Sequence, residues 1–126
     1  MNQVPVEQTI RDFMVLYYGT LTNNRSALAE SFYIDQAILT YQSDSFQGIP
    51  KIKEKYGSLG FQKLQVIPSI LEIQQTPGNM FLVYVYGRLQ GDNDRPLMFS
   101  DVLILVSTPQ GIRISNHVFS LIIADP

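Results

Sequence analysis

The chain contains a single histidine, His117, the side chain best suited to acid–base chemistry near neutral pH. Asp101 lies on the preceding predicted strand, and a carboxylate beside an imidazole can orient it as a general base. Tyr17 and Tyr41 could donate hydrogen bonds to an oxyanion. Such an enzyme needs His117 and Asp101 to face one cavity. A lone strand histidine is more commonly a hydrogen-bonded surface or interface residue, and tyrosines on apolar stripes usually belong to the core. We therefore expect no enzyme.

Two further carboxylates, Asp92 and Asp94, lie in a segment dense in turn-forming residues, 91–96. They could hold a cation or fill a turn. A calcium loop needs more oxygen ligands, together with a glycine and a terminal glutamate at set spacings that are absent here. The chain also has no cysteine and no phosphate-binding or metal-ligand motif. The sequence therefore predicts neither a metal nor a cofactor.

The distribution of charge argues against a nucleic-acid interface. The nine Lys and Arg residues are scattered and the net charge is -2, whereas nucleic-acid binding relies on clustered cations. The longest apolar runs, 102–106 and 121–124, are far shorter than the ~20 residues of a membrane-spanning helix, and no secretory signal is visible at the N-terminus. We expect a soluble intracellular protein with neither a nucleic-acid nor a membrane partner.

Helices are expected in the first half of the chain. Apolar residues recur at helical spacing from 10 to 21, and Pro5 marks a plausible start for that helix. Asn24 or Ser26 could cap a second, short helix. Pro50 fits the first turn of a third, where its missing N–H is harmless.

Strands are expected in the second half. A short strand at 37–41 and a polar turn at 42–45 come first, and the later strands are predicted at 64–73 (bent near Pro68), 80–90, 97–107 and 112–123. Helices followed by consecutive strands joined by tight turns indicate an α+β fold with an antiparallel sheet. With no linker or repeat, we expect one domain over residues 1–126.

The strand around 81–86 is apolar on both faces. Such a strand is covered on both sides, which here means the core on one side and a partner on the other. We therefore predict a homodimer formed through the sheet face that carries Tyr84, Val102 and Val118. A low content of charged residues, 16% against ~25% in typical domains, fits a surface reserved for a partner, although strand-rich domains also carry fewer charges.

Six short peptides resemble the nuclear transport factor 2 family in their order and spacing. They are FYID at 32–35, LTY at 39–41, FQG at 46–48, SLGFQK at 58–63, DND with PLMF at 92–99, and NHVFSL at 116–121. The resemblance implies a cone-shaped fold in which a curved antiparallel sheet wraps the N-terminal helices and leaves an apolar cavity at its mouth. It also implies a homodimeric carrier that takes the GDP-bound form of the small GTPase Ran into the nucleus and contacts phenylalanine-glycine nucleoporins. Such a carrier works in the cytoplasm and nucleus and at the nuclear pore and envelope.

The resemblance also implies a binding site, in which an aromatic side chain of Ran enters the cavity and rim acids meet basic residues beside it. The matching cavity positions are Tyr41, Leu59, Phe61, Leu64, Phe99 and Phe119. The rim positions are Asp92, Asp94 and Gln42, the last replacing a family acid. The family tryptophan that helps to hold nucleoporin repeats corresponds to Val6. Arg95 is a further departure because it adds a positive charge after Asp94.

Two alternatives stay open at this point. One is a related scaffold or heterodimer partner in RNA export or in granules. The other is a cone-fold isomerase or dehydratase that uses His117 and Asp101. The LTY, FQG and FQK peptides resemble the free-standing carrier more closely, and we therefore prefer that interpretation.

Overall fold

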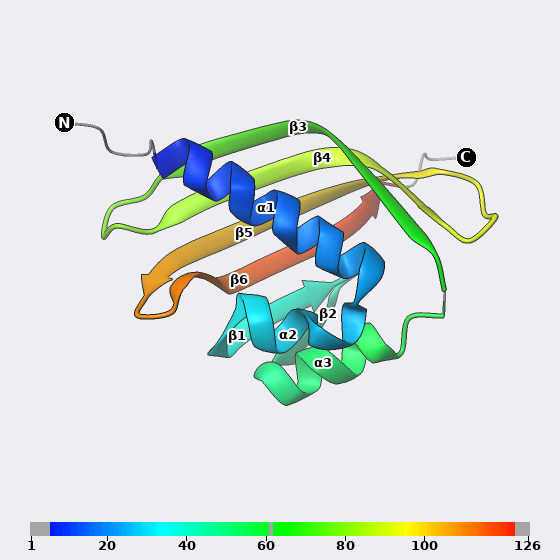
Figure 1. Cartoon of the computed structure of the whole chain (residues 1–126), viewed down its shortest axis with the longest axis horizontal. Helices are drawn as coiled ribbons and strands as arrows, with labels where there is room; N and C mark the ends of the chain where they lie inside the picture. The colour runs from blue at the N-terminus through cyan, green and yellow to red at the C-terminus, as the bar shows by residue number, and fades with distance from the viewer. Residues whose placement is uncertain (1–5, 61, 123–126) are drawn as a thin grey trace.

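The computed structural model describes residues 6–60 and 62–122 and shows three α-helices packed against one curved sheet (Figure 1). In chain order the elements are α1 (Val6–Asn23), a short 3-10 helix (Arg25–Ala27), α2 (Leu28–Phe32), β1 (Tyr33–Tyr41), β2 (Asp44–Gln47), α3 (Ile49–Gly57), β3 (Leu64–Gln75), β4 (Phe81–Gly91), β5 (Leu97–Thr108) and β6 (Gly111–Ile122). The predicted α+β fold with N-terminal helices is confirmed.

Helix α1 follows the predicted apolar stripe. Ile10, Met14 and Tyr17 are almost fully buried, while Val15 and Leu16 are more than 60% exposed. The predicted start, Pro5, lies outside the described residues. Among the described helices, none is long and apolar enough to cross a membrane.

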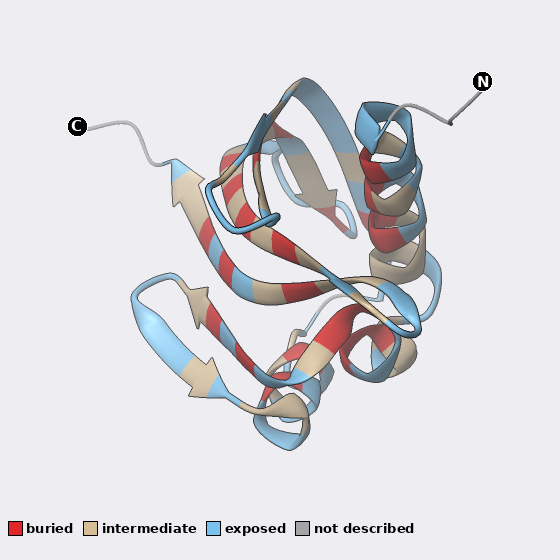
Figure 2. Ribbon diagram, turned by 90° about the vertical axis from the view of Figure 1, so that its left-hand side faces the viewer, coloured by how far each residue is buried: buried red, intermediate tan, exposed pale blue. Residues whose placement is uncertain are grey.

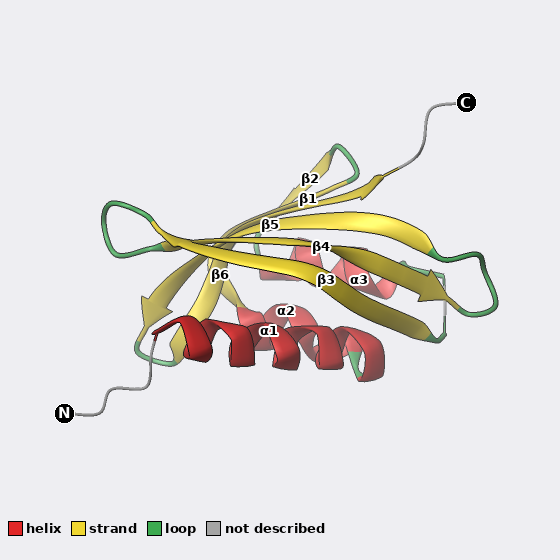
Figure 3. Ribbon diagram, turned by 90° about the horizontal axis from the view of Figure 1, so that it is seen from above, coloured by secondary structure: helices red, strands yellow, loops and turns green. Residues whose placement is uncertain are grey.

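The sheet is mixed rather than wholly antiparallel, with strand order β2-β1-β6-β5-β4-β3. Strands β3 to β6 form the predicted antiparallel meander. Strand β1 pairs in parallel with β6, bringing Tyr41 beside Phe119. Sequence order could not reveal this pairing, because it joins the first strand to the last. All three helices lie on one side of the sheet (Figure 3).

The predicted bend in β3 is confirmed at Pro68, where the pairing register with β4 shifts. Gly87 of β4 lies opposite Pro68. A Cβ atom on Gly87 would stand 2.5 Å from the carbonyl oxygen of Ile67, a distance that real side chains do not tolerate. The glycine therefore permits the close backbone approach at which the sheet bends.

Two local predictions in the first half need correction. The turn predicted at 42–45 comprises only Gln42 and Ser43, both with positive φ, and Asp44 already belongs to β2. Backbone hydrogen bonding extends the hairpin further than its polar composition suggests. Asn24 precedes the 3-10 helix without capping it, because its side chain accepts a hydrogen bond from the hydroxyl of Ser26.

The core lies between the helices and the concave face of the sheet. Along β4, β5 and β6 buried residues alternate with more exposed ones (Figure 2). This alternation places one set of side chains against the helices and leaves the other set on the outer face.

Candidate functional site

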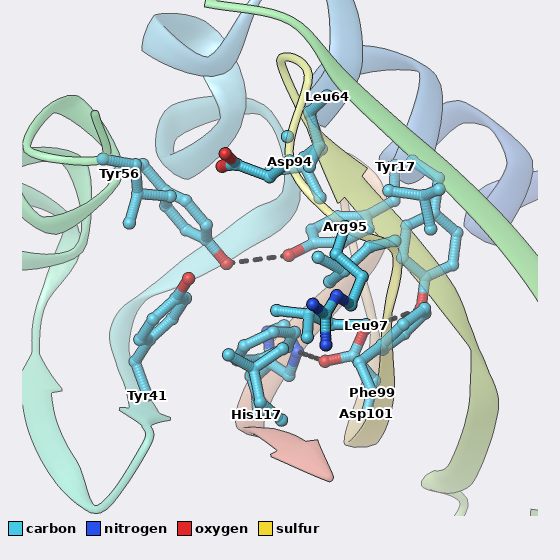
Figure 4. A pocket seen from close by; sticks show the side chains of 18 residues that line it. Tyr17, Tyr41, Tyr56, Leu64, Asp94, Arg95, Leu97, Phe99, Asp101 and His117 are labelled. Atoms are coloured by element: carbon cyan, nitrogen blue, oxygen red, sulfur yellow. Dashed lines mark hydrogen bonds and ion pairs between the residues drawn. The ribbon is translucent and has the colours of Figure 1, made fainter. Parts of the chain in front are cut away.

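A cavity of about 120 Å³ lies between α1, α3 and the strands (Figure 4). Its wall is mainly apolar, its floor is polar, and its rim carries charge. It is lined by Tyr17, Tyr18, Leu21, Tyr41, Tyr56, Leu59, Leu64, Val66, Leu89, Gly91, Asp94, Arg95, Leu97, Phe99, Asp101, His117, Phe119 and Leu121.

Most of the predicted cavity residues line this space. Five positions do so: Tyr41, Leu59, Leu64, Phe99 and Phe119. The sixth, Phe61, lies outside the described residues. Three of the rings form a stack along one wall: Tyr41 and Phe119 have ring centroids 4.6 Å apart, and Phe119 and Phe99 have centroids 6.0 Å apart. Parallel β1–β6 pairing builds this wall, because it places Tyr41 next to Phe119.

The predicted rim residues separate into two groups. Asp94 lines the cavity, whereas Asp92 and Gln42 do not. Asp92 accepts hydrogen bonds from the backbone N–H groups of Gln62 and Lys63, at 3.0 and 2.9 Å, and so ties the segment before β3 to the hairpin. Gln42 accepts the backbone N–H of Leu121 at 3.1 Å. Asp92 therefore has the structural role in a turn that the sequence left open.

The floor of the cavity is a buried hydrogen-bond network centred on Asp101 and His117. Asp101 accepts the hydroxyl of Tyr18 at 2.7 Å and His117 Nε2–H at 2.6 Å. The side chains of His117 and Asp101 are 1% and 3% exposed. The expectation of a surface or interface histidine was therefore wrong. The apolar sequence around His117 reflects a strand whose inner face is core.

Three tyrosines extend this network into the core. Tyr33 OH lies 2.8 Å from His117 Nδ1, and Tyr56 OH lies 2.8 Å from the hydroxyls of both Tyr33 and Tyr17. In a neutral imidazole whose Nε2–H points at Asp101, Nδ1 accepts a hydrogen bond, so Tyr33 must donate. Tyr33 can then accept from Tyr56 at 2.8 Å or from Tyr17 at 3.2 Å, and the shorter contact favours Tyr56, which leaves Tyr17 to donate to Tyr56. Every buried side-chain nitrogen and oxygen among the described residues has a partner.

Burial keeps these phenols protonated. Desolvation is the largest cause that raises the pKa of Tyr17, Tyr18 and Tyr33 well above the ordinary value, and nearby Tyr33, Asp101 and Tyr56, respectively, add to it. Desolvation also raises the pKa of Tyr56, although its hydrogen bonds to Tyr17 and Tyr33 act in the opposite direction. The tyrosines are therefore O–H donors at neutral pH.

The geometry tests the enzyme alternative directly. His117 and Asp101 do line the cavity, as that alternative requires. Both ring nitrogens of His117 are nevertheless engaged, one by Asp101 and one by Tyr33. A general base needs a nitrogen within hydrogen-bond reach of the substrate proton. The network is thus arranged to satisfy buried polar groups, and no described group of residues forms a metal-binding cluster.

The predicted dimer residues lie side by side on the outer face of the sheet. Tyr84 pairs with Val102, and Val102 pairs with Val118, so the three form one row across β4, β5 and β6. Tyr84 is 37% and Val118 44% exposed. The predicted nucleoporin residue, Val6, is exposed at the start of α1.

Several cavity residues escaped sequence reasoning. Tyr56 lies one helical turn after Ile52, and the spacing identified both only as one face of α3. Tyr18 belongs to the apolar stripe of α1, where nothing distinguishes it from a core residue. Arg95 lies in a turn whose side-chain direction the sequence does not fix. Of the six residues in the hydrogen-bond network, the sequence singled out Tyr17, Asp101 and His117, the last two as a contacting pair, and missed Tyr18, Tyr33 and Tyr56.

Comparison with known proteins identifies relatives of the whole chain. The family profile described as the nuclear transport factor 2 (NTF2) domain matches residues 9–121. Nuclear transport factor 2B of Arabidopsis thaliana is 33% identical over 124 residues, covering 96% of this chain and 98% of that protein. The solved structure of nuclear transport factor 2 from Cryptosporidium parvum superposes with a TM-score of 0.88 at 35% identity, covering 97% of this chain and 99% of that one.

More distant structures share the fold alone. The yeast UBP3-associated protein BRE5 superposes with a TM-score of 0.82 at 21% identity, covering 95% of this chain and 98% of that one. Proteins named for dehydratase and hydroxylase activities match at 16% and 15% identity. Fold likeness at this level does not transfer a function.

Proposed function

Because the chain belongs to the nuclear transport factor 2 family, we propose that it is a non-enzymatic nuclear import carrier. In this proposal its cavity binds the GDP-bound form of Ran, its surface contacts phenylalanine-glycine nucleoporins, and it works as a homodimer. It moves between cytoplasm and nucleus through the nuclear pore and is found at the nuclear envelope. The names of its relatives support the role in nuclear transport.

The observation that carries the proposal is the size and wall of the cavity. An apolar cavity of about 150 Å³ accepts a benzene molecule, and the cavity here measures about 120 Å³. One aromatic side chain is therefore the right size for it. The stacked rings of Tyr41, Phe119 and Phe99 offer faces and edges for a further ring. A buried aromatic anchor in a pocket is a common centre of binding energy.

A pair of matched variants tests whether this cavity receives Ran. Leu59→Trp fills the cavity from its wall, whereas Leu16→Trp makes the same change on the exposed face of α1, where Leu16 is 64% exposed. Calorimetric titration with Ran-GDP should show at least a roughly tenfold loss of affinity for Leu59→Trp, since hot-spot contacts are worth about 2 kcal/mol or more. Leu16→Trp should bind like the parent protein.

The same titration distinguishes the nucleotide states. The carrier should bind Ran-GDP and not Ran loaded with a GTP analogue. Equal binding of both states, or equal losses in the two tryptophan variants, would contradict the proposal.

The nucleoporin contact is proposed at Val6, which is 51% exposed. Valine lacks the flat aromatic surface that stacks on phenylalanine, so we expect weak binding of a phenylalanine-glycine repeat peptide. Val6→Trp should strengthen it, and Val15→Trp, which is further along α1 and 71% exposed, serves as the control. An unchanged affinity in Val6→Trp would place the contact elsewhere.

The homodimer is proposed on the row formed by Tyr84, Val102 and Val118. A glutamate at Val118 would put a charge at one end of this apolar row, and buried unpaired charges strongly oppose association. Sedimentation should show a dimer for the parent protein and for Val15→Glu, and a monomer for Val118→Glu. A parent protein that is monomeric at micromolar concentration would overturn this part of the proposal.

A further inference from the structure

Four tyrosines line the cavity, and the hydroxyls of three of them are already engaged inside the protein. Tyr18 donates to Asp101 at 2.7 Å, and the hydroxyls of Tyr17 and Tyr56 lie 2.8 Å apart. Tyr41 is the exception, because its hydroxyl forms no hydrogen bond with residues 6–60 and 62–122. It points into the cavity in Figure 4. An uncharged polar group in an apolar wall, with room for a partner only inside the cavity, is a directional point of recognition.

The ring of Tyr41 is held in place by its neighbours. It stacks on the ring of Phe119, with centroids 4.6 Å apart and planes 24° apart. Lys55 Nζ stands 4.6 Å from the centroid of the Tyr41 ring, within the range of a cation–π interaction. A hydroxyl on a ring that is already ordered loses little conformational freedom when it binds a ligand.

The Tyr41 hydroxyl is uncharged at neutral pH and can donate or accept a hydrogen bond. Burial is the largest cause that raises its pKa; Asp101 raises it further and Arg25 opposes the rise. The lining residues Asp94 and Arg95 also carry opposite charges. Charges of both signs thus lie near the wall, so this hydroxyl offers a neutral ligand a directional contact.

The space beside Tyr41 suits one aromatic ring. The cavity measures about 120 Å³, and an apolar cavity of about 150 Å³ holds a free benzene molecule. A ring in this space would lie against the stacked side chains of Phe119 and Phe99. A hydroxyl on that ring would find its partner at Tyr41.

We propose that the cavity is also a binding site for a free, neutral, one-ring phenol, whose ring packs against the stacked aromatic side chains and whose hydroxyl pairs with that of Tyr41. Binding of the phenol does not depend on the proposed function. One consequence does rest on it: a bound phenol fills the space that the partner's aromatic side chain needs. The two therefore exclude each other, and a small phenol inhibits the carrier.

The test compares phenol with benzene, which differs from it by one hydroxyl. Each is titrated into the full chain, and binding is followed by the NMR chemical shifts of the cavity residues. We expect phenol to bind roughly two- to tenfold more tightly than benzene, the net worth of one neutral hydrogen bond.

Two matched pairs of variants locate the site. Tyr41→Phe deletes one oxygen and should bind benzene more tightly than phenol, because a buried hydroxyl without a partner opposes binding. Tyr86→Phe makes the same deletion at a position that does not line the cavity and should keep the preference for phenol. Leu59→Trp, which fills the cavity, should bind neither compound, whereas Leu16→Trp should bind both.

Three results would overturn the phenol site. They are binding of benzene as tight as that of phenol, a preference for phenol that survives Tyr41→Phe, and phenol binding that is unchanged in Leu59→Trp. The absence of any binding would overturn it too.

A competition experiment separates this inference from the proposed function. Titration with Ran-GDP in the presence of phenol should show a lower apparent affinity than titration without it. If phenol binds as expected and the affinity for Ran-GDP does not change, the phenol site stands and binding of Ran in the cavity is contradicted. If Leu59→Trp weakens Ran-GDP binding and phenol does not bind, the carrier proposal stands and the phenol site is refuted.

Discussion

The direction of the hydrogen bonds in the cavity floor predicts an unequal series of tyrosine variants. Tyr33→Phe removes the donor to His117 Nδ1 and leaves a buried acceptor without a partner, which costs about 1–3 kcal/mol. In the series of hydrogen bonds from Tyr17 through Tyr56 and Tyr33 to His117, Tyr17 donates and accepts none. Its removal takes away one hydrogen bond, to Tyr56, and orphans no donor, so it should cost about 0.5–1.5 kcal/mol.

Tyr56→Phe should fall between these two. It removes the acceptor for Tyr17, but the Tyr17 hydroxyl can turn to Tyr33, 3.2 Å away. Each variant deletes only an oxygen atom, so the ring packing is retained. The free energy of unfolding thus reports the network rather than the volume of the core.

Urea denaturation at pH 8 and one fixed protein concentration measures this series, since association would otherwise alter the apparent stability. Tyr41→Phe is the control, because its hydroxyl forms no hydrogen bond with residues 6–60 and 62–122, and it should stay within about 0.5 kcal/mol of the parent protein. If Tyr17→Phe lowers the free energy of unfolding as much as or more than Tyr33→Phe does, the assigned direction of these hydrogen bonds is refuted.

Three further changes have defined outcomes. The buried tyrosines have pKa values raised above those in the unfolded chain, so the native state holds their protons longer. Their contribution to the free energy of unfolding should be constant below about pH 10 and be lost as the pH rises further, seen as unfolding that coincides with tyrosinate absorbance. Gly87→Ala places a Cβ against the backbone of Ile67 and should cost roughly 1–3 kcal/mol, whereas Gly57→Ala, which meets nothing within 4 Å, should not. Asp92→Ala removes the acceptor for Gln62 and Lys63, so hydrogen exchange of those two amides should accelerate, and Asp94→Ala should leave them unchanged.

The parts of the fold that depend on local pattern were predictable from the sequence. Apolar residues at helical spacing identified α1, and Pro68 marked the bend in β3. Alternation along the later strands was enough to place Tyr84, Val102 and Val118 on one face. Their common row depends on register, which the short turns between these strands set.

The parts that depend on distant pairing were not predictable in the same way. Parallel pairing of β1 with β6 joins segments about 80 residues apart in the chain, and no local signal encodes it. The same limit explains Asp92. The composition of segment 91–96 fits a turn, a rim or a cation site equally well. Only the positions of the Gln62 and Lys63 amides, which donate to Asp92, decide among these roles. The resemblance to the nuclear transport factor 2 family predicted which residues form the cavity wall, but it did not predict the direction in which Arg95 points.

The cavity has a floor of buried, hydrogen-bonded side chains and an open mouth. Substitutions at the floor and at the mouth have different effects on the stability of the fold. Every polar atom of Asp101 and His117 has a partner inside the protein, so a change there removes a buried hydrogen bond and lowers stability. The side chains of Arg95 and Asp94 form no hydrogen bond or ion pair with the described residues, so changes there cost the fold little. The charge around the opening can therefore change without loss of the fold, whereas the network beneath cannot. Selectivity for a partner is best sought at the mouth, where charge is set by residues that the fold does not need.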